Sequence, residues 1–128
     1  MADNGTRCAF CHISAERIGL ESHLAYSIRD AFPVTELHSL VIPRRHAVDY
    51  FSLTREELLA CDDLIRRVRE EILLKDPGVG GFNLGVNNGV VAGQTVLHCH
   101  FHVIPRRQGD VANPRGGIRH LLPGKGNY

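Results

Sequence analysis

The stretch that decides the predicted fold is His98-Cys99-His100-Phe101-His102-Val103-Ile104, in which histidine occupies every second position. Side chains two apart in sequence lie on the same face of a β-strand but not of a helix. We therefore predict a strand over Val96–Ile104 that places the three imidazoles on one exposed face, about 6.6 Å apart in rise. Cys99, Phe101 and Val103 then face the core.

Three imidazoles on one face suit phosphoryl chemistry. Imidazole is unprotonated often enough near neutral pH to attack phosphorus, and a phosphoramidate intermediate divides one difficult substitution into two easier ones. The preceding segment, Gly89–Thr95, offers backbone N–H groups and a hydroxyl that can cradle a phosphate. Two other interpretations stay open: an ordinary polar sheet face, and a stripe that binds one metal ion, for which a spacing of about 6.6 Å is wide.

The sequence on either side of this strand predicts an α+β fold. Thr54 and Glu57 form a capping-box pattern, and apolar residues then recur at helical spacing until Asp76-Pro77-Gly78. A short helix is expected around Ser14–Ile18. The other predicted strands are His23–Arg29, Ser39–Ile42, which Pro43 ends, and Phe82–Val86. Together these segments predict an antiparallel sheet of about five strands with one long and one short helix.

The composition limits the classes of function. The 128 residues predict a single domain over 1–128, with an irregular tail from about 106 to 128. A net charge of +1 gives no field that attracts nucleic acid or a membrane, and no apolar run suits a signal peptide or a spanning helix. We expect a cytoplasmic protein, in which the pair Cys8-Ala9-Phe10-Cys11 serves metal or redox chemistry; the eight histidines favour metal. Cys61 and Cys99 are expected in the core.

The stretch from His98 to Ile104 resembles the signature of the histidine-triad (HIT) family, in which histidines alternate with hydrophobic residues. Ala92-Gly93-Gln94-Thr95-Val96 is similar to the family's phosphate loop, and His38-Ser39-Leu40-Val41-Ile42-Pro43-Arg44-Arg45-His46 to its other core strand. The resemblance covers roughly Cys8 to Arg107, and Asn113–Arg119 is similar to the tail of bacterial diadenosine-polyphosphatase-like members. Glu36-Leu37 stands where the family often has Pro-Gly, and the segment around Asp30 is atypical.

This resemblance implies a nucleotide hydrolase that cleaves a phosphoanhydride or phosphoramidate bond at the α-phosphate of a purine nucleotide conjugate, such as a dinucleoside polyphosphate. It implies that His100 is the nucleophile, and that His102 and His38 contact the phosphate and the leaving group. The implied substrate contacts are Asn87, Gly93, Gln94 and Thr95 for the phosphate loop and ribose side, Asp30 for the ribose hydroxyls, and Phe10, Ile13 and Ile28 for the base.

The zinc-carrying members of the family extend the resemblance to the cysteine pair. They imply that a structural zinc ion is held by Cys8, Cys11, His46 and His98. Two thiolates and two imidazoles make a closed tetrahedral site, so His98 would serve as scaffold instead of contacting phosphate. A redox dithiol and a pair of reduced thiols without metal are the alternatives.

Three classes of function stay open: a hydrolase, a nucleotidyltransferase that uses the same intermediate, and a non-catalytic, zinc-stabilised nucleotide-binding module. The resemblance also implies a homodimer, with which the long amphipathic helix is compatible. A group of arginines either reaches the distal phosphates of a polyphosphate or forms a solvated basic tail. The group consists of Arg106, Arg107, Arg115 and Arg119.

Overall fold

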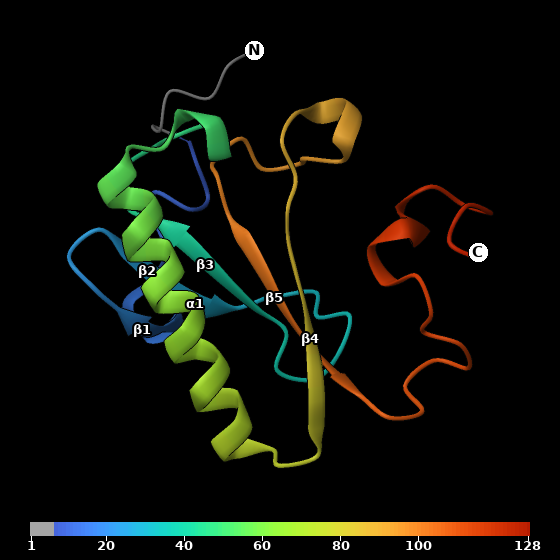
Figure 1. The fold of residues 1–128 in the computed structure, drawn as a ribbon. Helices are drawn as coiled ribbons and strands as arrows, with labels where there is room; N and C mark the ends of the chain where they lie inside the picture. The colour runs from blue at the N-terminus through green and yellow to red at the C-terminus, as the bar shows by residue number, and fades with distance from the viewer. Residues whose placement is uncertain (1–6) are drawn as a thin grey trace.

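A computed structural model describes residues 7–128 and contains one antiparallel sheet of five strands, in the order β1-β2-β3-β5-β4 (Figure 1). The strands are β1 (Ile18–Glu21), β2 (Ala25–Arg29), β3 (Ser39–Pro43), β4 (Val79–Val86) and β5 (Phe101–Arg107). The α+β prediction of about five antiparallel strands and one long helix is confirmed. The predicted short helix is a 3-10 turn, Ala15–Arg17.

The long helix α1 (Arg55–Lys75) crosses one face of the sheet (Figure 1). Its predicted start is confirmed, because the Thr54 hydroxyl accepts from the Glu57 N–H while the Glu57 carboxylate accepts from the Thr54 N–H. Within residues 7–128, no helix has both the length and the apolar character that crossing a membrane requires.

The two faces of the sheet carry different clusters. Under α1, helix residues such as Cys61 and Leu64 pack against Val41, Phe101 and Val103. On the opposite face a second cluster unites Tyr26, Ile28, Leu40 and Ile42 with the N-terminal Phe10 and Ile13. His102 is in register with Leu40 and belongs to this second face, because neighbouring residues of β5 alternate between faces. The sheet thus separates the core under α1 from the opposite face, which carries His102.

Several predicted boundaries are wrong. β1 was not predicted, and β2 begins at Ala25 instead of His23. Pro43 belongs to β3 and pairs with Ala25, because a proline can occupy the last position of a strand. β4 begins three residues before the predicted Phe82, and the tail contains a 3-10 turn at Gly117–Leu121.

The most consequential error concerns the histidine strand, which begins at Phe101 instead of Val96. The last pairs with both neighbours are Val41–Phe101 and Val86–Phe101, so the ladder stops there. Before that point the Cys99 N–H donates to the Ala47 carbonyl, outside the sheet, over 2.7 Å. The three histidines therefore do not form one exposed stripe: His98 is completely buried and His100 is 7% exposed.

An ion pair between exposed Arg45 and buried Glu57 links the start of α1 to the segment after β3. The Arg45 guanidinium donates two hydrogen bonds of 2.9 Å to Glu57, which is 4% exposed and also accepts from the Thr54 N–H. The Arg45 hydrogen bonds are the main reason that the pKa of Glu57 falls to about 2. This contact fixes the chain next to His46.

The lowered pKa of Glu57 predicts how stability depends on pH. Its carboxylate stabilises the fold above its ordinary pKa of 4.5, and that contribution is lost as pH falls toward about 2. Urea denaturation of Glu57→Gln should show a loss of about 1 kcal/mol at neutral pH and a weaker acid dependence below pH 4.5 than the parent. Asp62→Asn, which breaks the exposed Asp62–Arg66 pair, is the matched control and should change stability by a few tenths of a kcal/mol. An acid dependence in Glu57→Gln equal to that of the parent would contradict the assignment.

Candidate functional site

A cluster of two cysteines and two histidines lies where the N-terminal segment meets the end of β3. The ligand atoms of Cys8, Cys11, His46 and His98 all lie within 4.8 Å of one another. The Cys8 Sγ is 3.3 Å from the His98 Nδ1, and the Cys11 Sγ is 3.3 Å from the His46 Nδ1 and 3.5 Å from the His98 Nδ1. The structure therefore brings together the four residues that the sequence assigned to one site.

The chemistry of these donors fits a metal ion. The His98 Nε2 lies 2.7 Å from the Pro43 carbonyl oxygen, which can only accept, so Nε2 carries the ring proton of the neutral imidazole. The His98 Nδ1 then has one lone pair and lies close to two sulfur atoms. A single hydrogen bond would account for only one of these two contacts. Tetrahedral zinc with two sulfur and two nitrogen ligands places ligand atoms roughly 3.3–3.8 Å apart, which matches these contacts. The Tyr26 hydroxyl supports the cluster by donating to the Phe10 carbonyl between the two cysteines.

His100 lies beside this cluster but has a different environment. Its Nδ1 is 2.8 Å from the His98 carbonyl oxygen, so Nδ1 is the donor and the neutral ring keeps its lone pair on Nε2. The rings of Phe10 and His102 contact it edge-on, with centroids 5.0 and 5.2 Å away. His100 is therefore oriented by the backbone, and in its neutral form the nitrogen available for attack is Nε2.

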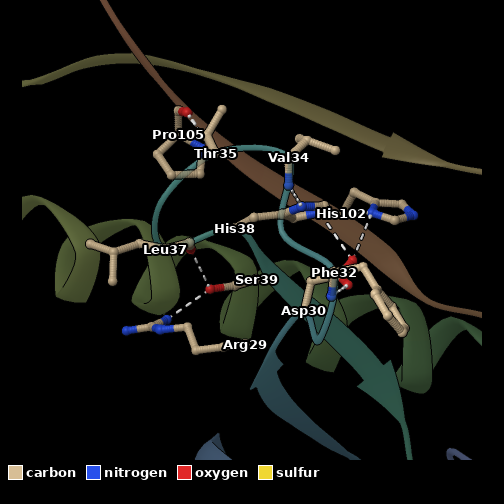
Figure 2. Close-up of polar contacts among 10 residues, drawn as sticks. All are labelled: Arg29, Asp30, Phe32, Val34, Thr35, Leu37, His38, Ser39, His102 and Pro105. Carbon is tan, nitrogen blue, oxygen red and sulfur yellow. Dashed lines mark hydrogen bonds and ion pairs between the residues drawn. The ribbon is translucent and has the colours of Figure 1, made fainter. Parts of the chain in front are cut away.

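His102 forms a second group with His38 and Asp30 (Figure 2). The His38 Nε2 is 2.9 Å from the His102 Nδ1 and 3.4 Å from the Asp30 Oδ2, and this Asp30 oxygen is 4.0 Å from the His102 Nδ1. On the other side of the His38 ring, the Val34 N–H donates to Nδ1 over 3.1 Å. The other Asp30 oxygen accepts from the Phe32 N–H, which fixes the carboxylate.

This second group fits a hydrogen-bond network better than a metal ion. Because the Val34 amide is a donor, the His38 Nδ1 must be unprotonated, and the only proton of the neutral ring lies on Nε2. A metal bound at Nε2 would have to displace that proton and leave an imidazolate. The two clusters therefore differ in chemistry, although both contain two histidines.

Burial sets the charge of these histidines. It is the main cause that lowers the pKa of His102 to about 4, and His100 and His38 lower it further against the opposing effect of Asp30. Burial also lowers the pKa of His38, again against Asp30. Both rings therefore favour the neutral form more strongly than an unperturbed histidine, whose pKa is 6.5.

The predicted phosphate loop folds around the side chain of Gln94. Its amide accepts from the Gly89 N–H and donates to the Val48 and Val96 carbonyls over 2.8, 2.6 and 3.1 Å. Gln94 is 3% exposed, so its side chain supports the loop from within. Gly93 has a φ of 95°, which favours glycine. Thr95 is exposed and Asn87 is half-buried.

The other predicted contacts separate into two regions. Phe10, Ile13 and Ile28, the residues expected to contact the base, come together in the apolar cluster of the sheet face that carries His102. The predicted phosphate-binding arginines have partners in the protein. Arg106 pairs with Asp110 and Arg107 with Asp76, while the guanidinium carbons of Arg115 and Arg119 each lie 4.7 Å from the centroid of the Tyr128 ring.

Sequence reasoning missed the residues that set the histidine protons. The carbonyls of Pro43 and His98 and the amide of Val34 are backbone groups, which leave no signature in residue types. It also missed the ion pair between Arg45 and Glu57. The sequence did offer a hint of this pair, because a basic residue lies next to the expected ligand His46 and an acidic residue begins the predicted helix.

The chain is similar in sequence and in fold to known proteins. A family model described as the HIT domain matches residues 13–109. The uncharacterized HIT-like protein MG132 of Mycoplasma genitalium is 39% identical over 106 residues, which are 77% of this chain and 72% of that protein. The adenosine 5'-monophosphoramidase HNT1 of Candida albicans is 31% identical over 107 residues, 78% of this chain and 70% of that protein. The crystal structure of a Zn-bound histidine triad family protein from Mycobacterium smegmatis has a TM-score of 0.75 at 30% identity, covering 86% of this chain and 82% of that one.

Proposed function

This chain belongs to the HIT family, and we propose that it is a nucleotide hydrolase that cleaves a phosphoanhydride or phosphoramidate bond at the α-phosphate of a purine nucleotide conjugate. A dinucleoside polyphosphate is the example that we favour. The relative from Candida albicans, whose name describes an adenosine 5'-monophosphoramidase, supports this class of substrate. The hydrogen bond from His100 Nδ1 to the His98 carbonyl carries the proposal, because it leaves a nucleophilic Nε2 beside a second histidine.

The reaction proceeds in two displacements. The His100 Nε2 attacks the α-phosphorus, a P–N bond forms, and the bond to the leaving group breaks with its electron pair. Water then attacks the same phosphorus, the P–N bond breaks, and the nucleoside monophosphate leaves while the proton of the water passes to solvent. His102 and Thr95 of the loop donate hydrogen bonds to the phosphate oxygens, on which charge develops. The Gly93 N–H donates to the Val90 carbonyl, so Gly93 shapes the loop.

The proposed nucleotide lies along the sheet face that carries His102. The base occupies the apolar cluster of Phe10, Ile13 and Ile28, and the ribose hydroxyls donate to Asp30. Asn87 lies at the end of β4, on the ribose side of the loop. The substrate is thus recognised on the face opposite α1, and no contact with nucleic acid or membrane is proposed.

Replacement of the nucleophile is the direct test. His100→Ala should lower the turnover of diadenosine polyphosphates by roughly a thousand-fold or more, because only binding and loop contacts are left to act. Product formation is measured by chromatography of the monophosphate, and His23→Ala, which changes an exposed histidine, should keep the parent rate. A parent rate in His100→Ala would contradict the mechanism. A parent protein that binds nucleotide without turnover would identify a binding module, and transfer to an added phosphate or sugar acceptor would identify a nucleotidyltransferase.

We further propose that Cys8, Cys11, His46 and His98 hold a structural zinc ion. The interatomic distances and the Zn-bound relative from Mycobacterium smegmatis support this assignment. Four protein ligands leave no open position, so the metal supplies rigidity, and no step of the reaction uses it. It would tie the N-terminal segment to the chain that precedes β5.

Zinc content gives the next test. The parent protein should contain about one zinc ion per chain by elemental analysis, and Cys11→Ser should lose most of it and unfold at a lower temperature. Cys61→Ala is the matched control, because Cys61 lies in the core under α1 and should keep its zinc. A protein that is purified and reconstituted with zinc but binds none would overturn the assignment.

We also propose that two protomers associate through α1 and β4 as a homodimer. β4 forms an edge of the sheet, and its Leu84 is 53% exposed on the face where Val103 packs under α1. The surface beside it forms a hollow between helix and strand, lined in part by Ile65, Leu73 and Phe82. An exposed apolar edge of this kind is stable when another chain covers it.

An oligomeric-state measurement tests the interface. Leu84→Arg should convert the dimer to a monomer in sedimentation analysis, because it places a charge in the apolar contact. Phe51→Arg, which changes another apolar residue, 79% exposed and outside this surface, should leave the dimer intact. A parent protein that sediments as a monomer would show the proposal to be wrong.

A further inference from the structure

A hollow of about 530 Å³ lies on the face of the sheet that carries His102. Buried and half-buried residues alternate at the start of β5, so His102, Ile104 and Arg106 share this face. Ile104 and Arg106 line the hollow, and Ile104 follows His102 by two residues, or about 6.6 Å of rise. The hollow is of the size of small-molecule sites, which measure roughly 300–1,000 Å³.

The loop between β2 and β3 forms another wall of the hollow. Val34 and Thr35 lie in its lining, and the Thr35 hydroxyl donates to the Pro105 carbonyl over 2.8 Å, which holds the loop against β5. The Val34 N–H also donates to the His38 Nδ1, so Val34 lies next to the pair of His38 and His102 (Figure 2). The loop that borders the hollow thus also borders the histidine group.

The order of the strands places the hollow and the expected base pocket on opposite sides of His102. The apolar cluster with Phe10, Ile13 and Ile28 lies on β2 and β3, whereas Ile104 and the other strand residues of the hollow belong to β5 and β4. A nucleotide conjugate with its phosphorus at His102 would therefore extend its base to one side and its leaving group to the other.

The direction of attack points the leaving group the same way. In a displacement at phosphorus, the entering atom and the leaving atom lie roughly in line on opposite sides. The ring of His100 lies next to that of His102, with centroids 5.2 Å apart, and precedes it along the chain, whereas Ile104 follows it. A leaving group expelled opposite the His100 Nε2 therefore departs toward Ile104 and the hollow.

The charges of the lining favour an uncharged occupant. The Arg106 guanidinium donates to both carboxylate oxygens of Asp110, over 2.7 and 2.8 Å, and the Arg107 guanidinium donates to Asp76 over 2.8 Å. Both cations are thus paired within the protein, and the exposed Glu36 adds a negative charge to the lining. The hollow therefore offers little attraction to additional phosphates.

Apolar side chains form much of the remaining surface. Val34 is 69% exposed and Val111 is 47% exposed, and both line the hollow together with half-buried Ile104. An apolar group placed between them would remove its own surface and theirs from water, which is favourable.

We propose that this hollow is a leaving-group subsite, which takes an uncharged apolar or aromatic body carried by the group that leaves the α-phosphorus. This inference rests on the proposed function. Two kinds of conjugate carry such a body. In the phosphoramidate of an organic amine it is attached to the leaving nitrogen, and in a dinucleoside polyphosphate it is the second base.

The first comparison changes the body and keeps the leaving atom the same. Methylamine and n-butylamine have nearly equal basicity, so their phosphoramidates of adenosine monophosphate differ mainly in apolar length. In the parent, the kcat/KM of the butyl conjugate should exceed that of the methyl conjugate by roughly tenfold or more, because the hollow covers the added methylene groups. The conjugate of 4-aminobutyrate, which has a similar length but ends in a carboxylate, should lack this advantage.

The second comparison concerns the base of a dinucleoside polyphosphate. The kcat/KM of diadenosine tetraphosphate is compared with that of adenosine tetraphosphate, which has the same number of phosphates and no second base. The alkyl preference and the diadenosine preference then distinguish the two sources of the body.

Variants of the lining locate these preferences. Ile104→Thr keeps a β-branched residue in β5, and Val111→Ser changes a residue outside the sheet; each should lower at least one of the two preferences by roughly threefold or more. Leu74→Ser, which removes an apolar side chain that is 85% exposed on α1, is the matched control and should keep both preferences. A fall in the alkyl preference assigns the hollow to amine substituents, and a fall in the diadenosine preference assigns it to the second base.

The subsite and the proposed function fail in different ways. Thermal unfolding and zinc content establish that each variant is folded. If the parent cleaves neither the methyl phosphoramidate nor diadenosine tetraphosphate in a His100-dependent way, the proposed function is wrong. The same preferences are also measured by calorimetry as ratios of Kd in His100→Ala, with and without the lining substitutions, so the subsite is tested without turnover. If Ile104→Thr and Val111→Ser leave both preferences at their parent values, the subsite is wrong.

Discussion

A neutral imidazole carries one ring proton, and in this chain the backbone determines where that proton lies on each histidine of the site. The Pro43 carbonyl holds the proton of His98 on Nε2, and the His98 carbonyl holds that of His100 on Nδ1. The Val34 amide forces the proton of His38 onto Nε2 and, through it, that of His102 onto Nε2 as well. Similar side chains thus acquire different chemistry in their neutral forms. His98 presents a lone pair to two sulfurs, His100 keeps its lone pair on Nε2, and His102 has its N–H donor on Nε2.

These backbone groups are available because the chain leaves the sheet before Phe101. In a continuous strand, the carbonyl of His98 and the amide of Cys99 would point along the sheet toward neighbouring strands. Here the Cys99 N–H bonds to Ala47, and the His98 carbonyl accepts from the ring two residues later. The irregular segment therefore permits His98 to turn toward the cysteines while His102, in β5, stays on the open face of the sheet.

The sequence predicts the parts of this protein that depend on periodicity and on residue type. Period-two alternation predicts the inward positions of Cys99, Phe101 and Val103, and the capping box predicts the first turn of α1. The cysteine spacing, read with the family resemblance, predicts a metal cluster whose members the structure brings together. Alternation does not report where a ladder of hydrogen bonds ends, so the strand was predicted five residues too early. The network around His38 was also beyond prediction, since its first donor is an amide that every residue except proline has.

His98 joins the cluster of two cysteines and two histidines to His100, the proposed nucleophile. The ring of His98 faces the two sulfurs, while its carbonyl oxygen accepts from the His100 Nδ1. A ligand cannot rotate freely about its bonds when a metal holds its ring, so zinc at the proposed site would also fix the direction of this carbonyl. Movement of the carbonyl by a fraction of the 2.8 Å contact would weaken the hydrogen bond that keeps the proton on Nδ1. The His100 ring could then rotate, and its Nε2 lone pair would no longer be held in one direction toward the proposed substrate. A closed metal site with no open position would thus serve the proposed reaction by holding the peptide that orients the proposed nucleophile.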